Sequence, residues 1–332
     1  MAGVDVTVVI PTRDRLVSLL ATLAGVWRQR DVRLEVVLVD DGSGRDVAPR
    51  YERLRSDRVR VLRNASSQGP AAARNAGISV ARGRWVAFLD DDDLWAPTKL
   101  RRQLDAAERA QAAWAWCGAV YLSGEGRVLS VASAPSPDDV RRRLPSGPVI
   151  PAGASNVIGR TSLLRRLGGF DEGIFHMPDW DLWLRLLVAD PGAAHPEPLV
   201  GYVQHEEMLS RRRTMVMDRD LAIIDRKLRA HGLRPTDARV RRGLLEWMAQ
   251  AHVAAGQWGP AARTYARSGV RYRRFDDLAL ALGALGRSRG WRIAEPVARR
   301  LAPAEPSAPA ERPRWLDEYV EFPPVTTRHH GV

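Results

Sequence analysis

The sequence predicts an α/β fold: a mostly parallel β-sheet with helices on both faces, followed by an α-helical extension. Two observations lead to this expectation. Short β-branched runs alternate with amphipathic helical segments through the first 105 residues, and this alternation is typical of parallel sheets. Three of the expected strands also end in polar or acidic residues, and ligands of such sheets bind beyond the carboxyl ends of the strands.

Hydrophobic periodicity and turn residues place the elements of this first part. Val4–Ile10 is a β-branched run that ends at Pro11, and apolar residues then recur at helical spacing from Leu16 to Trp27. A Gln-Gly-Pro break at residues 68–70 precedes a further helix. The other expected strands are Leu34–Val39, Val59–Leu62 and Trp85–Leu89, and the other expected helices are Val47–Leu54 and Ala71–Val80.

The later part of the chain is expected to mix strands and helices. Ala119–Leu122 and Val128–Val131 flank a glycine-containing turn, which predicts a hairpin. Residues 135–151 contain five prolines and are expected to form a loop across the mouth of the site. Trp114 and Trp116 are expected in the core. Further helices are expected at Leu100–Trp116, Leu163–Leu167, Met217–Ala230, Val240–Ala255 and Ala261–Ser268, with another that contains Leu182 to Leu187.

Composition and charge exclude several classes of protein. The single cysteine, Cys117, excludes an internal disulfide framework and a cysteine-rich zinc site, and it fits a reducing compartment. Residues 215–332 carry 21 Lys and Arg against 13 Asp and Glu, so +8 of the net charge of +12 lies there. The sequence has no zinc-finger spacing, RNP aromatic pattern or basic-region heptad, so we expect no nucleic-acid partner.

The expected location is the cytoplasm. Residues 1–10 lack the basic region and cleavage site of a signal peptide, and no segment reaches about 18 uncharged apolar residues. The basic C-terminal third leaves open a peripheral contact with the anionic inner surface of a membrane. The alternative is that its arginines are dispersed over solvated helices.

Four consecutive carboxylates, Asp90 to Asp93, follow the expected strand Trp85–Leu89. Adjacent acids repel one another, and a hard cation that neutralises them would make the cluster tolerable. Oxygen ligands suit Mg²⁺ or Mn²⁺, which in turn suit diphosphates. The alternative is a solvated acidic loop that caps the next helix, with Asp93 near its N-terminus and Pro97 in its first turn.

Six motifs occur along the chain in the order Val8–Thr12, Val39–Ser43, Gly69–Gly77, Phe88–Asp93, Gly168–Glu172 and Asp179–Arg185. Together they resemble the GT-A nucleotide-sugar glycosyltransferases, specifically the inverting family 2. The resemblance covers about residues 4–210 and implies a Rossmann-like GT-A fold, with residues 1–105 as the nucleotide-binding half and residues 106–214 as the acceptor half. Residues 215–301 would form the helical extension, and residues 302–332, which begin with an Ala/Pro/Glu-rich stretch, a linker and a disordered tail.

The resemblance also implies roles for individual residues. Asp41 would recognise the base of the nucleotide, Asp91 would lie near the ribose, and Asp92 would bind a divalent cation that bridges the diphosphate. Arg74 would lie near the base or the phosphates. This chain has Arg13-Asp14 where the family often has Tyr-Asn, so the contacts with the base are expected to differ. The implied donor-binding residues are Pro11, Thr12, Arg13, Asp41, Arg74, Asp90 and Asp91.

Asp179 would be the general base, because inverting transfer needs a proton acceptor on the face opposite the leaving group. The family usually has Glu before this residue, where this chain has Pro178, and the alternative is that Asp179 only caps a helix. Asp181 is the better candidate for an interaction with the helix dipole. His205 either approaches the phosphates or metal or lies in a solvated loop.

The implied activity is non-processive transfer of one sugar, because the chain has neither membrane helices nor the Gln-x-x-Arg-Trp motif of processive members. A UDP-sugar is the expected donor and Mn²⁺ or Mg²⁺ the expected cofactor, while the acceptor stays open between a glycan, a lipid-linked molecule, a peptide and a small metabolite. Two alternatives remain. One is a catalytically inactive GT-A-fold protein that binds carbohydrate or a partner. The other is a nucleotidyltransferase. Such enzymes typically have a glycine-rich loop after the first strand, where this chain has Pro11 to Asp14 instead.

Overall fold

A computed structural model describes residues 3–175, 177–204, 217–230, 232, 238–254, 257–286 and 312–319 of the chain. The chain divides into two compact units. The first unit comprises residues 1–144, 148–205 and 309–332, and the second comprises residues 145–147 and 206–308. The predicted fold class is confirmed, because a mixed α/β unit is followed by a helical region.

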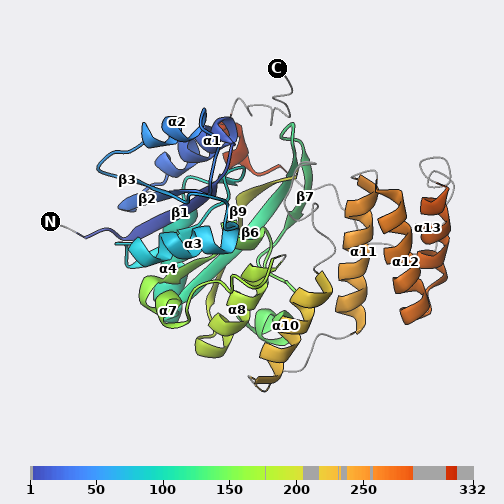
Figure 1. The fold of residues 1–332 in the computed structure, drawn as a ribbon. Helices are drawn as coiled ribbons and strands as arrows, with labels where there is room; N and C mark the ends of the chain where they lie inside the picture. Colours follow the sequence, from blue (N-terminus) through green and yellow to red (C-terminus); the bar gives the residue numbers. More distant parts are fainter. Residues whose placement is uncertain are drawn as a thin grey trace. The chain divides into compact units, whose positions relative to one another are not determined.

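The first unit is built on a single mixed sheet, which has nine strands within the described residues (Figure 1). Its parallel part runs β3 (Val59–Arg63), β2 (Leu34–Asp40), β1 (Val6–Thr12) and β4 (Trp85–Phe88). The sheet continues through β8 (Ile158–Arg160), β6 (Trp114–Ser123), β9 (Ala193–Gln204) and β5 (Leu94–Trp95), and β7 (Val128–Ala132) pairs with β6. Strands β6 and β9 are parallel, and the remaining pairs are antiparallel.

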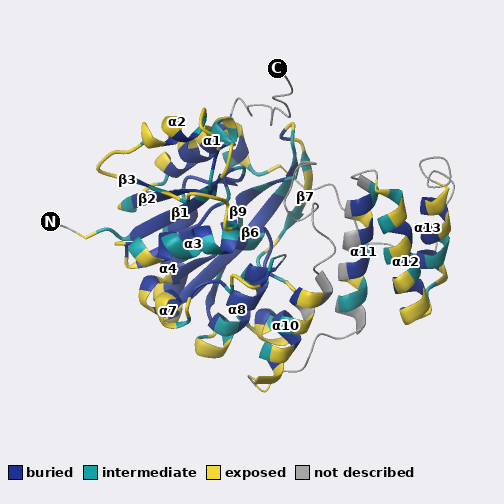
Figure 2. Cartoon of the chain, viewed as in Figure 1, coloured by how far each residue is buried: buried dark blue, intermediate teal, exposed yellow. Residues whose placement is uncertain are grey.

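Helices cover this sheet and leave its central strands buried, as the dark strands and the yellow outer helix faces in Figure 2 show. The side chains of Val8, Ile10 and Leu38 are fully inaccessible to solvent, since the central strands are covered on both sides. Helix α3 packs against β1 and β2. The helices of the unit are α1 (Leu16–Trp27), α2 (Ala48–Glu52), α3 (Pro70–Val80), α4 (Lys99–Ala110), α5 (Pro137–Arg143), α6 (Gly153–Asn156), α7 (Thr161–Arg166) and α8 (Pro178–Ala189).

The predicted helix Leu100–Trp116 was wrong in its second half. Helix α4 ends at Ala110, where Gln111 adopts the left-handed conformation, and Trp114 already belongs to β6. The error arose because the alanine-rich sequence around this boundary suits a helix, whereas pairing with β8 and β9 requires a strand. Trp114 and Trp116 are fully buried, so the prediction that they belong to the core is confirmed.

Two further segments differ from expectation. The proline-rich residues 135–151 contain α5, which begins at Pro137 and whose N-cap Ser136 accepts a hydrogen bond from the backbone N–H of Asp139. Asp93 and Pro97 do not cap a helix, because β5 follows the acids and α4 begins only at Lys99. The reading of Asp90 to Asp93 as a solvated helix cap is therefore wrong.

The second unit consists of α10 (Met217–Ala230), α11 (Ala238–Ala254), α12 (Trp258–Tyr272) and α13 (Phe275–Leu285) among its described residues. Helix α13 was not predicted. It packs closely on α12, because Gly269 leaves room for Leu278 and the buried Ser268 hydroxyl donates a 2.7 Å hydrogen bond to Asp277. The predicted helical extension is thus present and includes one more helix than the sequence pattern indicated.

Residues 312–319 fall inside the range 302–332, for which we predicted a linker and a disordered tail, yet they pack against the rest of the first unit. The 3-10 helix Arg314–Glu318 places the Trp315 indole N–H 2.8 Å from the carbonyl oxygen of Pro198, and the Tyr319 hydroxyl 2.5 Å from that of Trp95. A Cβ atom at Gly25 would collide with the Tyr319 hydroxyl, so this glycine makes room for the segment. The C-terminal segment therefore braces β5, which directly follows the acidic cluster.

Replacing Tyr319 by Ala is expected to destabilise the first unit by about 3 kcal/mol, because it empties a buried aromatic site. Tyr319→Phe is expected to cost only about 1 kcal/mol, the value of one hydrogen bond. Urea unfolding followed by tryptophan fluorescence measures both changes. Glu318→Gln is the control, since its ion pair with Arg30 is exposed and should contribute little. Equal stability of Tyr319→Ala and the unaltered protein would show that the segment does not brace the sheet.

Lys99 is a buried lysine in the core of this unit. Its side chain is fully inaccessible, its Nζ lies 3.8 Å from the ring centroid of Trp95, and Nζ has no hydrogen-bond partner among the described residues. Burial lowers the pKa of Lys99 to about 7, and the nearby Cys117 side chain opposes this shift only in part. Between pH 7 and the usual lysine value, the unfolded chain therefore holds a proton that the folded chain lacks.

Stability is consequently expected to rise with pH across this interval, because the unfolded state binds more protons there. Lys99→Met should remove that rise and should stabilise the protein at pH 7.5 by on the order of 2 kcal/mol or more. Urea unfolding at pH 7.5 and pH 9.5 gives the measurement. A constant difference between the two proteins at both pH values would contradict the expectation.

Candidate active site

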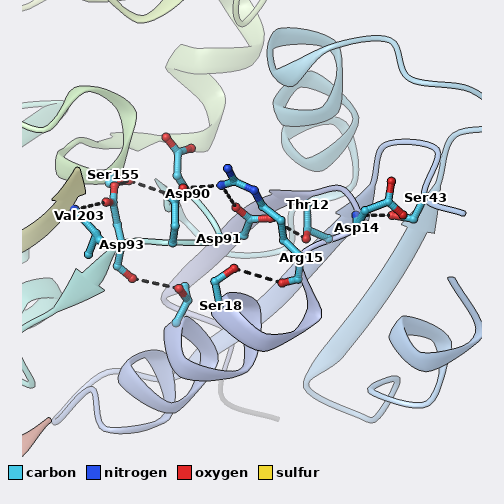
Figure 3. Close-up of polar contacts among 12 residues, drawn as sticks. Thr12, Asp14, Arg15, Ser18, Ser43, Asp90, Asp91, Asp93, Ser155 and Val203 are labelled. Atoms are coloured by element: carbon cyan, nitrogen blue, oxygen red, sulfur yellow. Dashed lines mark hydrogen bonds and ion pairs between the residues drawn. The ribbon is translucent and has the colours of Figure 1, made fainter. Parts of the chain in front are cut away.

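Three parallel strands end at one edge of the sheet and bring their polar residues together. The register pairs Thr12 of β1 with Asp40 of β2, and the backbone N–H of Asp41 donates to the carbonyl oxygen of Thr12 at 2.9 Å. On the other side of β1, the Thr12 hydroxyl donates a 2.7 Å hydrogen bond to Asp91, which follows β4 (Figure 3). The convergence that the sequence predicted for these strand ends is therefore observed.

The four consecutive acids have different partners. Asp90 forms an ion pair with Arg74, whereas Asp91 and Asp92 both accept hydrogen bonds from Arg15. Asp93 is buried and accepts from the Ser155 hydroxyl at 2.5 Å and from the backbone N–H of Val203 at 3.0 Å. Asp93 thus connects the end of β9 to the acidic cluster, whereas the first three acids pair with arginines.

Burial and mutual repulsion govern the electrostatics of this cluster. Burial and the charge of Asp92 raise the pKa of Asp91 to about 7, against the opposing effects of Arg15 and the Thr12 hydroxyl. Burial, together with the charges of Asp92 and Asp90, also raises the pKa of Asp93 well above its usual value. The cluster is therefore short of positive charge, even with its arginine partners in place.

The donor atoms at this edge fit a divalent cation. Asp91 and Asp92 offer only oxygen atoms, which suit Mg²⁺ or Mn²⁺, and the Arg15 guanidinium already places positive charge beside both. Among the described residues, no group of three or more His, Cys, Asp or Glu side chains could hold a metal ion. A cation would therefore take its remaining ligands from phosphate groups and water, as Mg²⁺ commonly does.

The charges of Arg74 and Asp90 act on Asp179. Arg74 is nearly inaccessible, pairs with Asp90 and lies with its Cζ 5.4 Å from the ring centroid of Phe170. Burial raises the pKa of Asp179, the charge of Arg74 opposes that shift, and the charge of Asp90 adds to it. A Cβ atom at Gly153, whose φ is +49°, would lie only 2.9 Å from the Asp179 carboxylate. A backbone turn without a side chain thus leaves room for this carboxylate.

Asp179 is not the N-cap of α8. The N-cap position is Met177, and Asp179 lies in the first turn of the helix, so the reading of Asp179 as a cap is wrong. Asp181, which we assigned to the helix dipole, is also in this turn and accepts hydrogen bonds from Arg185 at 2.6 and 3.0 Å.

Asp41 holds the loop that follows β3. Its carboxylate accepts four hydrogen bonds of 2.7 to 2.9 Å, from the Asn64 amide, the Ser67 hydroxyl and the backbone N–H groups of Gln68 and Gly69. Burial acts to raise the pKa of Asp41, but these four donors hold it below its usual value. Gly42 has a φ of +79°, and a Cβ atom there would meet the backbone of Ser67 at 2.6 Å. The Asp41-Gly42 turn therefore packs closely against this loop and is hydrogen-bonded to it.

Comparison with known sequences agrees with this geometry. Residues 7–168 match the sequence model described as "Glycosyl transferase family 2". The succinoglycan biosynthesis protein ExoO of Rhizobium meliloti is 31% identical over an alignment of length 234, which covers 66% of this chain and 66% of ExoO. The chain belongs to glycosyltransferase family 2. The Escherichia coli β-1,3-glucosyltransferase WfaP, named for UDP-Glc and α-D-GlcNAc-diphosphoundecaprenol, is 26% identical over 55% of this chain and 70% of WfaP.

Solved structures support the same fold for this family 2 glycosyltransferase. The crystal structure of S. aureus TarS 1-349 in complex with UDP-GlcNAc superposes with a TM-score of 0.58 at 17% identity, covering 91% of this chain and 93% of TarS 1-349. The mannosyltransferase PcManGT from Pyrobaculum calidifontis, in complex with GDP-Man and Mn²⁺, gives a TM-score of 0.50 at 18% identity, covering 91% and 87% of the two chains. These likenesses show a shared GT-A fold.

The predicted donor-site residues of this glycosyltransferase lie at different distances from the acidic cluster. Thr12, Asp90 and Arg74 contact or belong to it, as described above. Pro11 is the penultimate residue of β1, and Arg13 is more than half exposed and pairs with Asp14 at 3.7 Å. Neither Thr12 nor Asp14 caps α1, which has Arg15 at its N-cap position and no side-chain cap.

His205 lies outside the described residues. None of the described helices is long and apolar enough to cross a bilayer.

Sequence reasoning missed two residues that hold the acidic cluster in place. The Ser155 hydroxyl accepts from the backbone N–H of Asp90 at 3.0 Å while it donates to Asp93, so it fixes both ends of the acidic run. Arg15 pairs with the two middle acids. The available signals were the small residues around Ser155 and the position of Arg15, directly after a strand that ends beside an acidic cluster.

Proposed function

We propose that this chain is a metal-dependent, inverting and non-processive glycosyltransferase, which moves a sugar from a nucleotide-diphosphate sugar to an acceptor hydroxyl. The observation that supports this proposal best is the meeting of strand ends at one edge of the sheet, where Asp91 accepts from Thr12 and Asp90 pairs with Arg74. The charges of Arg74 and Asp90 also act on Asp179 at the start of α8. The acidic cluster after β4 would hold a cation together with the diphosphate of the donor, and the separate carboxylate of Asp179 would accept a proton.

The donor is proposed to be a UDP-sugar. This rests on TarS, whose structures contain UDP-GlcNAc or UDP, and on WfaP, which is named for UDP-Glc; PcManGT with GDP-Man makes a GDP-sugar the second candidate. The base would lie near Pro11, Arg13 and the loop held by Asp41. Because the Asp41 carboxylate already accepts four hydrogen bonds, a base that donates to it must displace one of them.

Asp92 is proposed to hold Mn²⁺ or Mg²⁺, and Asp91 with Thr12 to lie near the ribose. The bound cation would stabilise the negative charge that develops on the leaving nucleoside diphosphate. Asp179 would accept the proton of the acceptor hydroxyl as its oxygen attacks the anomeric carbon and the bond from that carbon to the diphosphate oxygen breaks. Attack on the face opposite the leaving group inverts the configuration. The raised pKa of Asp179 makes this carboxylate a stronger base than an exposed one.

The acceptor is proposed to be a glycan or a lipid-linked sugar, because ExoO is named for succinoglycan biosynthesis and WfaP for a diphosphoundecaprenol-linked sugar. A lipid-linked acceptor would be reached from the cytoplasm at the inner membrane surface, where the basic residues of the C-terminal third can contact anionic lipids.

A donor screen tests the proposal. Thermal unfolding and isothermal titration with UDP, GDP, UDP-Glc, UDP-GlcNAc and GDP-Man, each with and without Mn²⁺, should give a nucleotide that binds only with the cation present. The same donor should be hydrolysed slowly in the absence of an acceptor. If no nucleotide binds and no donor is hydrolysed, the proposed activity is refuted. Binding without hydrolysis or transfer would favour the inactive carbohydrate-binding alternative.

A further inference from the structure

We propose that Arg15 is an internal counter-cation for Asp91 and Asp92, which a divalent cation must displace, so that the cation binds well only together with a nucleoside diphosphate. This inference rests on the proposed function, since it concerns the same acidic cluster. Arg15 would be a positioning residue: it holds the carboxylates before substrate binds and takes no part in bond making.

The geometry places one nitrogen atom between two carboxylates. Nη1 of Arg15 donates to Asp92 Oδ2 at 2.5 Å and to Asp91 Oδ1 at 3.3 Å. Figure 3 shows this side chain reaching from the start of α1 toward the acidic run. About a quarter of the Arg15 side chain is exposed, compared with 15% for Asp92 and 9% for Asp91, so the pairs are partly shielded from solvent. Screening by water is therefore weaker than at an exposed ion pair.

The backbone of Arg15 is held in place from two sides. Its N–H donates to the Tyr51 hydroxyl at 2.9 Å, and its carbonyl oxygen accepts from the Ser18 hydroxyl at 3.2 Å. The Tyr51 side chain is fully buried, which fixes the position of its hydroxyl. The guanidinium is thus presented to the acids by a rigid backbone, whereas its long side chain can still rotate away.

The same contacts make Arg15 a competitor of a metal ion. A cation bound to Asp92 Oδ2 would occupy the space that Nη1 now takes at 2.5 Å, and two positive charges would lie side by side. Displacing Arg15 exposes its charge without a partner, and this cost opposes binding of the free cation. A diphosphate removes the cost, because its oxygen atoms can pair with the released guanidinium as well as with the cation.

Cation and nucleotide should therefore bind cooperatively. Thermodynamic linkage requires that the nucleotide raise the affinity for the cation by the same factor by which the cation raises the affinity for the nucleotide. Arg74 cannot take over the task of Arg15 without leaving its own pair with Asp90.

The test measures binding of Mn²⁺ to the full-length protein in the absence of nucleotide. Electron paramagnetic resonance gives the concentration of unbound Mn²⁺. Arg15→Gln is expected to bind Mn²⁺ at least about tenfold more tightly than the unaltered protein, because a charge next to the ion has been removed. Arg33→Gln is the matched control: it changes the net charge equally and also removes an arginine with a carboxylate partner, Asp5, which lies outside the acidic cluster. Its affinity for Mn²⁺ should be unchanged.

A second measurement repeats the titration with saturating UDP, and with GDP if UDP does not bind. In the unaltered protein the nucleotide should increase the affinity for Mn²⁺ by about tenfold or more, and in Arg15→Gln this increase should shrink. Equal Mn²⁺ affinity of Arg15→Gln and the unaltered protein would overturn the inference while the proposed function stands. If Arg15→Gln does not fold, Mn²⁺ binding to the unaltered protein that is independent of nucleotide overturns it equally. Absence of Mn²⁺ binding under every condition would refute both this inference and the metal dependence of the proposed function.

Discussion

Replacing Asp179 by Asn is expected to lower the kcat of sugar transfer by about 10²- to 10⁴-fold, the usual contribution of a positioned general base. The amide has almost the same shape as the carboxyl group, so it should fit beside Gly153 without disturbing the turn. It cannot accept the proton of an acceptor hydroxyl. Initial rates with the donor found in the screen, together with the Kd for that donor and Mn²⁺, measure the two consequences separately.

The control for this experiment is Asp181→Asn. It removes a carboxylate from the same turn of α8, but one that pairs with Arg185, so transfer should change far less. Retained donor binding in Asp179→Asn with transfer lost would support a general base. An unchanged kcat would refute the role of Asp179. Loss of donor binding would instead assign Asp179 to the donor site, through its proximity to Arg74.

The strands that end at the proposed donor site could be predicted because a single pattern, burial on both faces, dominates their sequences. β1, β2 and β4 are buried on both faces, so they appear as continuous β-branched and aromatic runs that end abruptly in polar residues. The order of the motifs then located Asp41, Arg74 and the acidic run. The parallel register of the strands brings Asp41 and the acidic run to one edge of the sheet, and Arg74 on α3 pairs with Asp90.

The parts that sequence reasoning missed depend on contacts between distant segments. The partners of Arg15 are 76 and 77 residues away, and an arginine near a helix start is usually a solvated side chain. The segment 312–319 is short and lies among residues of linker-like composition, and its packing depends on Trp95 and Pro198 far earlier in the chain. The boundary between α4 and β6 likewise depends on strand pairing, which local propensity does not encode.

Replacing Asp92 by Asn is expected to lower kcat/KM by about 100-fold or more and to abolish activation by Mn²⁺. An amide oxygen is a weaker ligand than a carboxylate and carries no charge to balance the cation. The loss corresponds to about 3 kcal/mol of transition-state stabilisation. The measurement compares rates after treatment with a chelator and after readdition of Mn²⁺, for Asp92→Asn and for the unaltered protein. Asp14→Asn is the charge-matched control, since this aspartate binds the Gly44 backbone N–H and pairs with Arg13 instead.

The response of Asp92→Asn to Mn²⁺ distinguishes between the two middle acids. Arg15 contacts Asp92 at 2.5 Å and Asp91 at 3.3 Å, so without the Asp92 charge the guanidinium is expected to pair with Asp91 alone. If Asp92 holds the cation, Mn²⁺ should fail to restore the activity of Asp92→Asn at the concentrations that restore the activity of the unaltered protein. If Mn²⁺ still activates Asp92→Asn, the cation must be held by Asp91, whose buried carboxylate also accepts from Thr12. In that case the assignment of the metal to Asp92 is refuted, although the acidic edge of the sheet keeps its role.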